Sequence, residues 1–305
     1  SHDADEYAGY LRQADLPGLE VRLATNIEAA EPAIGDADIV LGNPSWVARV
    51  LPQARSLAWV QSTFAGVAPL CQPGLRRDYQ LTTVRDVFGP LMSEYVFLHL
   101  LARERQLAAT WRAQAQARWE PMSYRGLGGQ TLGVCGLGSI GRHIAATARH
   151  FGMRVLGYRQ HDGDSDAVDR VYRGDELPGF LASLDYLVLV LPQTPQTHHL
   201  IDATALSQLR PDATLINVGR GDSVDEAALV SALASGKLRH AILDVFEQEP
   251  LPPDSPLWQL PNVTLTPHSS ARSFPADIAA LFAGNYRRYC RSQPLNYVVD
   301  FVRGY

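Results

Sequence analysis

Residues 131–152 read TLGVCGLGSIGRHIAATARHFG and carry the pattern that decides the fold. The apolar run 131–135 suits a buried strand, and Gly136, Gly138 and Gly141 follow it in G-x-G-x-x-G spacing. The apolar residues after the first glycines recur at helical intervals, at Ile140, Ile144, Ala148 and Phe151. A strand, a glycine turn and a helix, in this order, are what a dinucleotide-binding unit requires.

Each of the three glycines has a physical reason in such a unit. Gly136 allows the tight turn, Gly138 lets backbone N–H groups approach a pyrophosphate, and Gly141 lets the helix lie close to the strand. The helix N-terminus then offers unpaired N–H groups and the positive end of its dipole to the anion. An isolated G-x-G-x-x-G could be an ordinary glycine-rich turn, but the flanking strand and helix favour a dinucleotide site.

Arg159 bears on the choice of cofactor. It follows the apolar run 153–158, about 20 residues after the first glycine, where an NAD-binding unit usually has Asp or Glu for the ribose 2′-OH. A guanidinium can instead form a charge-assisted, bidentate pair with a 2′-phosphate. We therefore predict NADP(H), with NAD(H) possible if Arg159 faces solvent and Asp162 or Asp164 meets the ribose.

Composition limits the classes of protein to consider. The 305 residues include 46% hydrophobic and 19% charged residues, which is typical of a globular chain with a core. The net charge is −5 and the arginines form no basic block, so we expect no nucleic-acid partner. No apolar run reaches the roughly 18 residues of a membrane span. Three dispersed cysteines and no signal-peptide pattern point to the cytoplasm, without disulfides or a metal site.

Strand-like and helix-like segments alternate along the chain, which predicts parallel sheets covered by helices. The predicted strands are 19–24, 39–41, 57–61 and 81–84, then 131–135, 154–158, 186–191, 214–218, 241–245 and 263–266. Helices are expected from about Tyr7, from Gly89, over 226–235 and over 275–291, with an extended tail at 295–302. Because no strand precedes the first helix, either a short strand lies before residue 1 or the first sheet is small.

Residues 108–125 form a polar stretch with interspersed aromatic side chains, Trp111, Trp119 and Tyr124. Such a stretch could be a simple surface arm. Exposed aromatic residues are also what a contact between two copies would use, and we expect a homodimer.

Three chemically active residues follow three different predicted strands. Arg220 lies in NVGRG after one strand, Glu249 in DVFEQEP after the next, and His268 in TPHSS after the last. Ligands of doubly wound sheets collect at these strand ends. Hydride transfer to a carbonyl needs a cation for the substrate carboxylate, a proton donor and a carboxylate that orients the donor. Arg220, His268 and Glu249 meet these needs in turn. Each alone could be an ordinary loop residue, but their joint occurrence favours a catalytic set.

The motifs GLGSIG, LPQTPQT, NVGRGD, DVFEQEP and TPHSS, in this order, resemble the D-2-hydroxyacid dehydrogenase family over nearly the whole chain. Arg159 and the stretches QSTFAGVAPL and FGPLMSEYVF resemble its glyoxylate/hydroxypyruvate reductase branch. The resemblance implies that Arg220, Glu249 and His268 are catalytic and that Asp244 meets the nicotinamide amide. The expected cofactor-binding residues are Gly136, Leu137, Gly138, Ser139, Ile140, Gly141, Arg159, Leu191, Pro192, Thr197, Val218, Gly219 and Asp244.

The resemblance also implies that the backbone of Ala65, Gly66 and Val67 binds the substrate carboxylate, together with Arg220. A turn of small residues after a strand suits this role, because its N–H groups are accessible to an anion. One departure from the family pattern is the pair Ser269–Ser270, which replaces an apolar and then a small residue. The other is the nearby Arg272, which either binds the acid or is a surface residue.

These observations predict an α/β chain of two doubly wound parallel-sheet domains with a cleft between them. Residues 1–86 and 272–305 form a flavodoxin-like substrate domain, and 87–271 a Rossmann-type cofactor domain. The expected activity is reduction of a small 2-oxo acid to a 2-hydroxy acid, with NADPH preferred. The alternatives are an NAD-dependent dehydrogenase for another acid, such as a phosphorylated one, and a non-catalytic nucleotide sensor resembling a corepressor.

Overall fold

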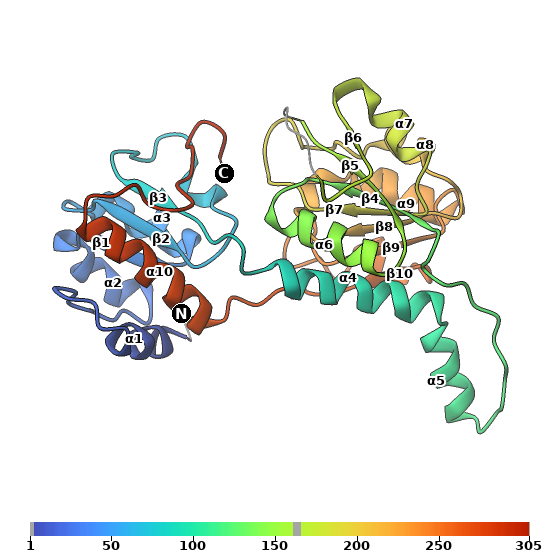
Figure 1. Cartoon of the computed structure of the whole chain (residues 1–305), viewed down its shortest axis with the longest axis horizontal. Helices are drawn as coiled ribbons and strands as arrows, with labels where there is room; N and C mark the ends of the chain where they lie inside the picture. The colour runs from blue at the N-terminus through green and yellow to red at the C-terminus, as the bar shows by residue number, and fades with distance from the viewer. Residues whose placement is uncertain (1–2, 161–165, 305) are drawn as a thin grey trace. The chain divides into compact units, whose positions relative to one another are not determined.

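The computed structural model describes residues 3–160 and 166–304, and the chain divides into two compact units. The first unit comprises Ser1–Val87 and Ser273–Tyr305, and the second comprises Phe88–Arg272. Each unit contains one parallel sheet with helices against it (Figure 1). The chain is therefore of the α/β class. No helix among the described residues is long and apolar enough to cross a membrane.

The sheet of the second unit has seven parallel strands in the order β10-β9-β8-β7-β4-β5-β6. The strands are β4 (Thr131–Cys135), β5 (Arg154–Tyr158), β6 (Arg170–Tyr172), β7 (Tyr186–Leu189), β8 (Thr214–Asn217), β9 (His240–Leu243) and β10 (Val263–Leu265). β4 lies where the strand order reverses, with β5 on one side and β7 on the other. The glycine turn after β4 is therefore at the topological switch point, where doubly wound sheets bind ligands.

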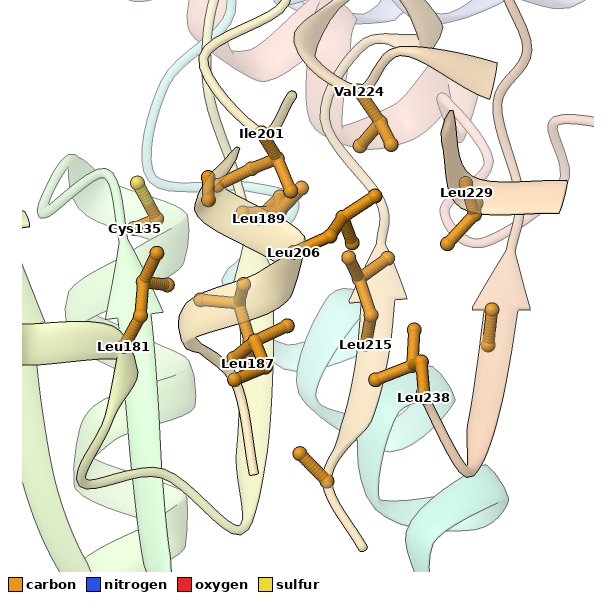
Figure 2. Close-up of a cluster of buried hydrophobic side chains, with 14 of the residues drawn as sticks. Cys135, Leu181, Leu187, Leu189, Ile201, Leu206, Leu215, Val224, Leu229 and Leu238 are labelled. Atoms are coloured by element: carbon orange, nitrogen blue, oxygen red, sulfur yellow. The ribbon is translucent and has the colours of Figure 1, made fainter. Parts of the chain in front are cut away.

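Two buried clusters lie on opposite faces of this sheet. Leu187 and Leu189 of β7 belong to one cluster and Val188 to the other, because neighbouring residues of a strand point to opposite faces. The helices α7 (Leu177–Leu181), α8 (Ala203–Gln208) and α9 (Glu226–Ala234) contribute to the first cluster (Figure 2). The helices α4 (Gly89–Glu104) and α6 (Ser139–His150) contribute to the second. Burial on both faces explains why these strands are almost continuously apolar.

The first unit contains a three-stranded parallel sheet in the order β1-β2-β3. Its strands are β1 (Ile39–Gly42), β2 (Trp59–Ser62) and β3 (Gln80–Thr82), and its helices are α1 (Ala4–Gln13), α2 (Ile27–Ala33), α3 (Pro44–Val50) and the terminal α10 (Pro275–Cys290). Trp59 is fully buried and stacks on Phe282 of α10, with 5.0 Å between the ring centroids. The last helix of the chain thus helps to form the core of its first unit.

Two predicted elements of the first unit are wrong. Residues 19–24 form no strand; Leu19 and Val21 are only partly buried against the core and take no place in the sheet. The tail 295–302 was expected to be extended but contains turns. It meets the end of β3 at a single bridge, between Val298 and Thr82. There the Val299 N–H donates to the Leu81 carbonyl at 2.8 Å and the Thr83 N–H donates to the Tyr297 carbonyl at 3.0 Å. Apolar residues dock against the core in both segments without completing a strand ladder.

The second unit differs from prediction mainly in detail. The short edge strand β6 was missed, because three residues give too little pattern to detect. The strands predicted at 186–191, 214–218, 241–245 and 263–266 all exist but end one or two residues earlier. The residues beyond those ends, among them Leu191 and Val218, begin the loops that carry the candidate site.

Candidate active site

The glycine turn after β4 shows which glycines the protein itself requires. Gly136 has a φ of +103°, a left-handed conformation that favours glycine, and a Cβ there would lie 2.5 Å from the Val190 carbonyl oxygen. A Cβ on Gly141 would lie 2.0 Å from the Gly136 carbonyl oxygen. A Cβ on Gly138, in contrast, would meet nothing within 4 Å. The open space beside Gly138 is where a bound pyrophosphate would need close access to the backbone.

The N-terminus of α6 completes this cradle. Gly138 is the N-cap residue and provides no side-chain cap, so the first N–H groups of the helix, at Ser139 and Ile140, are available to an anion. Leu137, between the first two glycines, is buried. Its side chain packs directly against Gly157 of β5, where a Cβ would lie only 2.6 Å from it, and this contact anchors the turn on the neighbouring strand. These residues fit the diphosphate of a dinucleotide.

Arg159 lies directly beside the glycine turn along the sheet. The Gly136 N–H donates to the Tyr158 carbonyl at 2.9 Å, and the Arg159 N–H donates to the Tyr172 carbonyl of β6 at 3.1 Å. Arg159 therefore begins the loop after β5, one strand away from the anion cradle. The competing candidates Asp162 and Asp164 lie outside the described residues.

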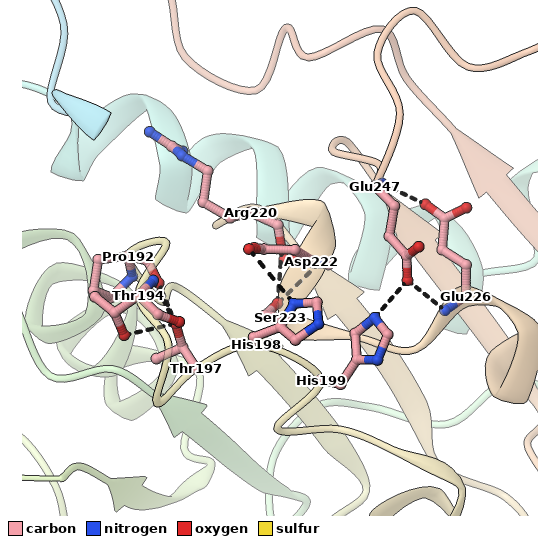
Figure 3. Close-up of polar contacts among 11 residues, drawn as sticks. Pro192, Thr194, Thr197, His198, His199, Arg220, Asp222, Ser223, Glu226 and Glu247 are labelled. Carbon is pink, nitrogen blue, oxygen red and sulfur yellow. Dashed lines mark hydrogen bonds and ion pairs between the residues drawn. The ribbon is translucent and has the colours of Figure 1, made fainter. Parts of the chain in front are cut away.

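The loop after β7 is organised by Thr197, which is buried. Its hydroxyl donates to the Pro192 carbonyl at 2.7 Å and accepts the Thr194 N–H at 3.0 Å (Figure 3). In the loop after β8, Gly219 follows the buried Val218. A Cβ on Gly219 would lie 2.6 Å from the Leu191 nitrogen, so the two loops are in close backbone contact. The loops after β7 and β8 are thus held together at the edge of the sheet next to the glycine turn.

The structure brings Glu249 and His268 into direct contact. The imidazole Nδ1 lies 2.7 Å from Glu249 Oε2, and because an ionised carboxylate only accepts hydrogen bonds, Nδ1 carries a proton. The N–H of Phe246 donates to Glu249 Oε1 at 3.0 Å. Both carboxylate oxygens are therefore held, which orients the carboxylate toward the histidine and leaves Nε2 of the histidine for another partner.

The electrostatics of the three residues are coupled. The hydrogen bond that His268 donates to Glu249 raises the pKa of His268, and burial and the charge of Arg220 oppose this effect. Burial raises the pKa of Glu249, but the hydrogen bonds of His268 and the Phe246 N–H and the charges of His268 and Arg220 outweigh it and leave the pKa lowered. Burial lowers the pKa of Arg220, and Glu249 and Asp222 oppose that effect. The arrangement stabilises an imidazolium beside a carboxylate.

The backbone of His268 is held in a strained conformation by Asp244. His268 has a φ of +49°, in the left-handed region that non-glycine residues rarely adopt. Asp244 is fully buried; its Oδ1 accepts the Ser269 N–H at 2.8 Å and its Oδ2 accepts the Ser270 N–H at 2.9 Å. The Thr266 hydroxyl also donates to Oδ1, at 2.6 Å.

This role of Asp244 was missed in the sequence, where the family resemblance assigns Asp244 to the nicotinamide amide. The only sequence signal was an acidic residue at the end of an apolar strand, which requires hydrogen-bond donors once it is buried. The donors Thr266, Ser269 and Ser270 come from a different strand end, so spacing could not identify them.

The N-terminal candidate residues lie in the loop after β2, in the first unit. The Thr83 hydroxyl donates to the Ala65 carbonyl at 2.7 Å, and the Ser62 hydroxyl accepts the Phe64 N–H at 3.0 Å. Ala65 is exposed, Gly66 is half-buried and Val67 is buried. The loop is thus fixed through its carbonyl groups and hydroxyl partners, while the backbone around Ala65 remains accessible.

The model of the D-isomer specific 2-hydroxyacid dehydrogenase family, NAD binding domain, matches residues 97–270. This chain belongs to that family. The match covers β4–β10 and contains the glycine turn, Arg220, Glu249 and His268. As a member of the D-isomer specific 2-hydroxyacid dehydrogenase family, the chain is an NAD(P)-dependent oxidoreductase.

Three relatives from this family are close in sequence or structure. Glyoxylate/hydroxypyruvate reductase A of Escherichia fergusonii is 34% identical over 217 residues, which are 71% of this chain and 70% of the relative. A family member of Aeromonas salmonicida has a TM-score of 0.94 at 49% identity, covering 98% of this chain and 97% of its own. The NADPH-dependent glyoxylate/hydroxypyruvate reductase of Sinorhizobium meliloti, solved with NADP and sulfate, has a TM-score of 0.85 at 30% identity, covering 99% and 96%.

Among the described residues of this dehydrogenase, no group of three or more His, Cys, Asp or Glu side chains could hold a metal ion.

The contact between Glu249 and His268 predicts a measurable change in a variant. Glu249→Gln keeps an oxygen acceptor but removes the negative charge, so the pKa of His268 should fall. An NMR titration of the imidazole resonances measures this directly. The resonances of His150, which is exposed at the end of α6, provide the internal control. An unchanged or higher pKa at His268 would show that Glu249 does not stabilise the imidazolium.

Proposed function

We propose that this chain reduces small 2-oxo acids to 2-hydroxy acids, with glyoxylate and hydroxypyruvate as the first substrates to test. The observation that carries the proposal is the His268–Glu249 pair, 2.7 Å apart, in the same unit as Arg220 and a dinucleotide cradle. The names of two relatives, both glyoxylate/hydroxypyruvate reductases, agree with it. In this proposal residues 87–271 bind the cofactor, and residues 1–86 and 272–305 bind the substrate.

The chemistry divides among three side chains. The reduced nicotinamide, when bound, supplies the hydride for the 2-oxo carbon. His268 donates the proton from Nε2 to the carbonyl oxygen, and Glu249 keeps the imidazole protonated and oriented. Arg220 binds the substrate carboxylate and stabilises the negative charge that develops on the oxygen. The N–H groups around Ala65, Gly66 and Val67 provide a further anion contact. One proton is consumed for each carbonyl reduced.

The departures at Ser269 and Ser270 affect specificity more than reaction type. Their N–H groups bind Asp244, a contact that any side chain at these positions could retain. Ser269 is exposed and Ser270 is buried, so only the Ser269 side chain changes the surface of the His268 turn, and the support from Asp244 is kept.

We further propose that NADPH is the preferred cofactor, because Arg159 begins the loop next to the anion cradle. A guanidinium there attracts a 2′-phosphate, whereas the acidic residue of NAD-binding units would repel it. The solved relative from Sinorhizobium meliloti contains NADP.

The first test is steady-state oxidation of NADPH and NADH with glyoxylate or hydroxypyruvate as acceptor. The wild type should be faster with NADPH, and His268→Ala should lower kcat by about 10²–10⁴-fold, the usual contribution of a general acid, while the Kd of NADPH stays unchanged. Turnover of His268→Ala near the wild-type rate would remove His268 as the proton donor. No turnover of either acid by the wild type would exclude these substrates and direct attention to other oxo acids.

Arg159→Ala tests the cofactor assignment by itself. Loss of a charge-assisted contact worth roughly 1.5–3 kcal/mol should raise the KM for NADPH by about ten- to a hundredfold and leave the KM for NADH nearly unchanged. Arg154→Ala, which removes an exposed arginine from the opposite end of β5, is the matched control. Equal effects on NADPH and NADH would mean that Arg159 does not contact a 2′-phosphate.

We also propose that a second copy of this chain covers the segment 108–125. Trp119 is 95% exposed and Trp111 of α5 (Leu107–Ala115) is 61% exposed. Large apolar side chains in such positions are typical of an interface. Sedimentation equilibrium should give a dimer for the wild type and a monomer for Trp111→Ser/Trp119→Ser. A wild type that stays monomeric at micromolar concentration would refute the homodimer.

A further inference from the structure

Two carboxylates outside the proposed catalytic set join the start of α9, which follows the Arg220 loop, to the loop that carries Glu249. The Glu247 N–H donates to Glu226 Oε1 at 2.7 Å, and the Glu226 N–H donates to Glu247 Oε1 at 3.1 Å (Figure 3). Each side chain thus accepts the backbone N–H of the other. We call this reciprocal pair, Glu226 and Glu247, the carboxylate clasp.

The clasp lies beside a close backbone contact. A Cβ on Gly221 would lie 1.8 Å from the Phe246 carbonyl carbon and 2.4 Å from the Glu247 nitrogen. Gly221 follows Arg220 directly, so the two loops touch through their main chains next to the proposed substrate-binding cation. Only glycine permits this approach, and the clasp fastens the same two loops a few residues away.

A third segment joins the clasp from the loop after β7. His199 Nε2 lies 2.9 Å from Glu247 Oε1, and the His199 N–H donates to the Asp222 carbonyl at 2.7 Å. His199 has a φ of +48°, which is unfavourable for a non-glycine residue. Contacts with Asp222 in the loop after β8 and with Glu247 in the loop after β9 hold His199 in this strained conformation.

The clasp also has an electrostatic cost. Burial raises the pKa of Glu226, the N–H of Glu247 lowers it, and the charges of Glu247 and Glu249 raise it again. Two like charges held together destabilise each other unless hydrogen bonds compensate. The two backbone N–H groups and the contact with His199 offset that cost.

We propose that Glu226 is a positioning residue that sets the location of Glu249, and through it of His268, relative to Arg220. The connection runs through one short segment: Glu226 holds the Glu247 N–H, and the preceding Phe246 N–H holds Glu249 Oε1. This inference rests on the proposed function, in which His268 donates the proton while Arg220 binds the acid. A shift of about 1 Å in such a pair can cost up to about a hundredfold in rate.

The experiment compares three variants of the whole 305-residue chain. Glu226→Ala should lower kcat about ten- to a hundredfold and leave the KM for NADPH within about twofold, because the cradle at Gly138 lies on another loop. Glu226→Gln retains an oxygen for the Glu247 N–H and should restore most of kcat. Asp225→Ala removes the N-cap of the same helix, whose carboxylate accepts the Ala228 N–H at 2.9 Å, but leaves the clasp intact. It should retain wild-type kcat.

A pH profile distinguishes positioning from general weakening of the fold. His268 faces Glu249, Arg220 and Asp244, and its imidazolium is the active form for reduction. Activity therefore falls as pH rises through the pKa of His268, and a displaced Glu249 moves this decline to lower pH in Glu226→Ala. The proposal is overturned if Glu226→Ala keeps the wild-type kcat and profile, or if Asp225→Ala reproduces its loss.

The inference can also be tested without turnover. An NMR titration of His268 in Glu226→Ala should show a lower pKa than in the wild type, with Glu226→Gln close to the wild type. This result would support the clasp even if the wild type reduced neither glyoxylate nor hydroxypyruvate, which is the outcome that would defeat the proposed substrates. An unchanged His268 pKa in Glu226→Ala would defeat the clasp whatever the substrate.

Discussion

The carboxylate of Asp244 is fully buried at the end of β9, and the geometry of the site depends on how its charge is satisfied. Desolvating a carboxylate costs several kcal/mol unless donors surround it. Here the donors are the Thr266 hydroxyl and the N–H groups of Ser269 and Ser270, all on the segment that follows β10. Satisfying one buried charge therefore forces the chain to turn at His268, and this turn directs the imidazole.

The same constraint connects the site to the helix that precedes the sheet. The Thr266 hydroxyl lies 2.6 Å from the Tyr95 hydroxyl of α4, so Tyr95, Thr266 and Asp244 form a continuous network. Such buried networks are rigid when every member is satisfied. The donor to Asp244 is thereby held in place from a helix whose other residues, Val96 and Leu100, are part of the core.

A structural feature could be predicted from the sequence when the interactions that form it are between residues close together in the chain. The strands around the glycine turn were predictable because apolar runs and glycine spacing are local signals, and the helix at Gly89 began where expected. The failure at 19–24 has the opposite cause: an apolar segment becomes a strand only if a neighbouring strand pairs with it. β6 pairs with β5 over three residues, a contact that depends on the sheet and leaves almost no pattern of its own.

The proposed catalytic residues were identifiable because parallel strands end at a common edge, so that chain order alone brings Arg220, Glu249 and His268 to one side of the sheet. What chain order cannot show is what keeps them at working distance. Asp244 accepts the backbone N–H groups that follow His268 and so holds the turn. The clasp holds the segment that carries Glu249. Asp244 sets the strained backbone at His268, whereas the pKa of the imidazole depends first on the hydrogen bond to Glu249, with the charge of Asp244 as a smaller contribution. A substitution at Asp244 therefore changes geometry and pKa together, whereas a substitution in the clasp moves Glu249 and leaves the contacts of Asp244 in place. The second kind of substitution isolates the contribution that the position of Glu249 makes to proton transfer.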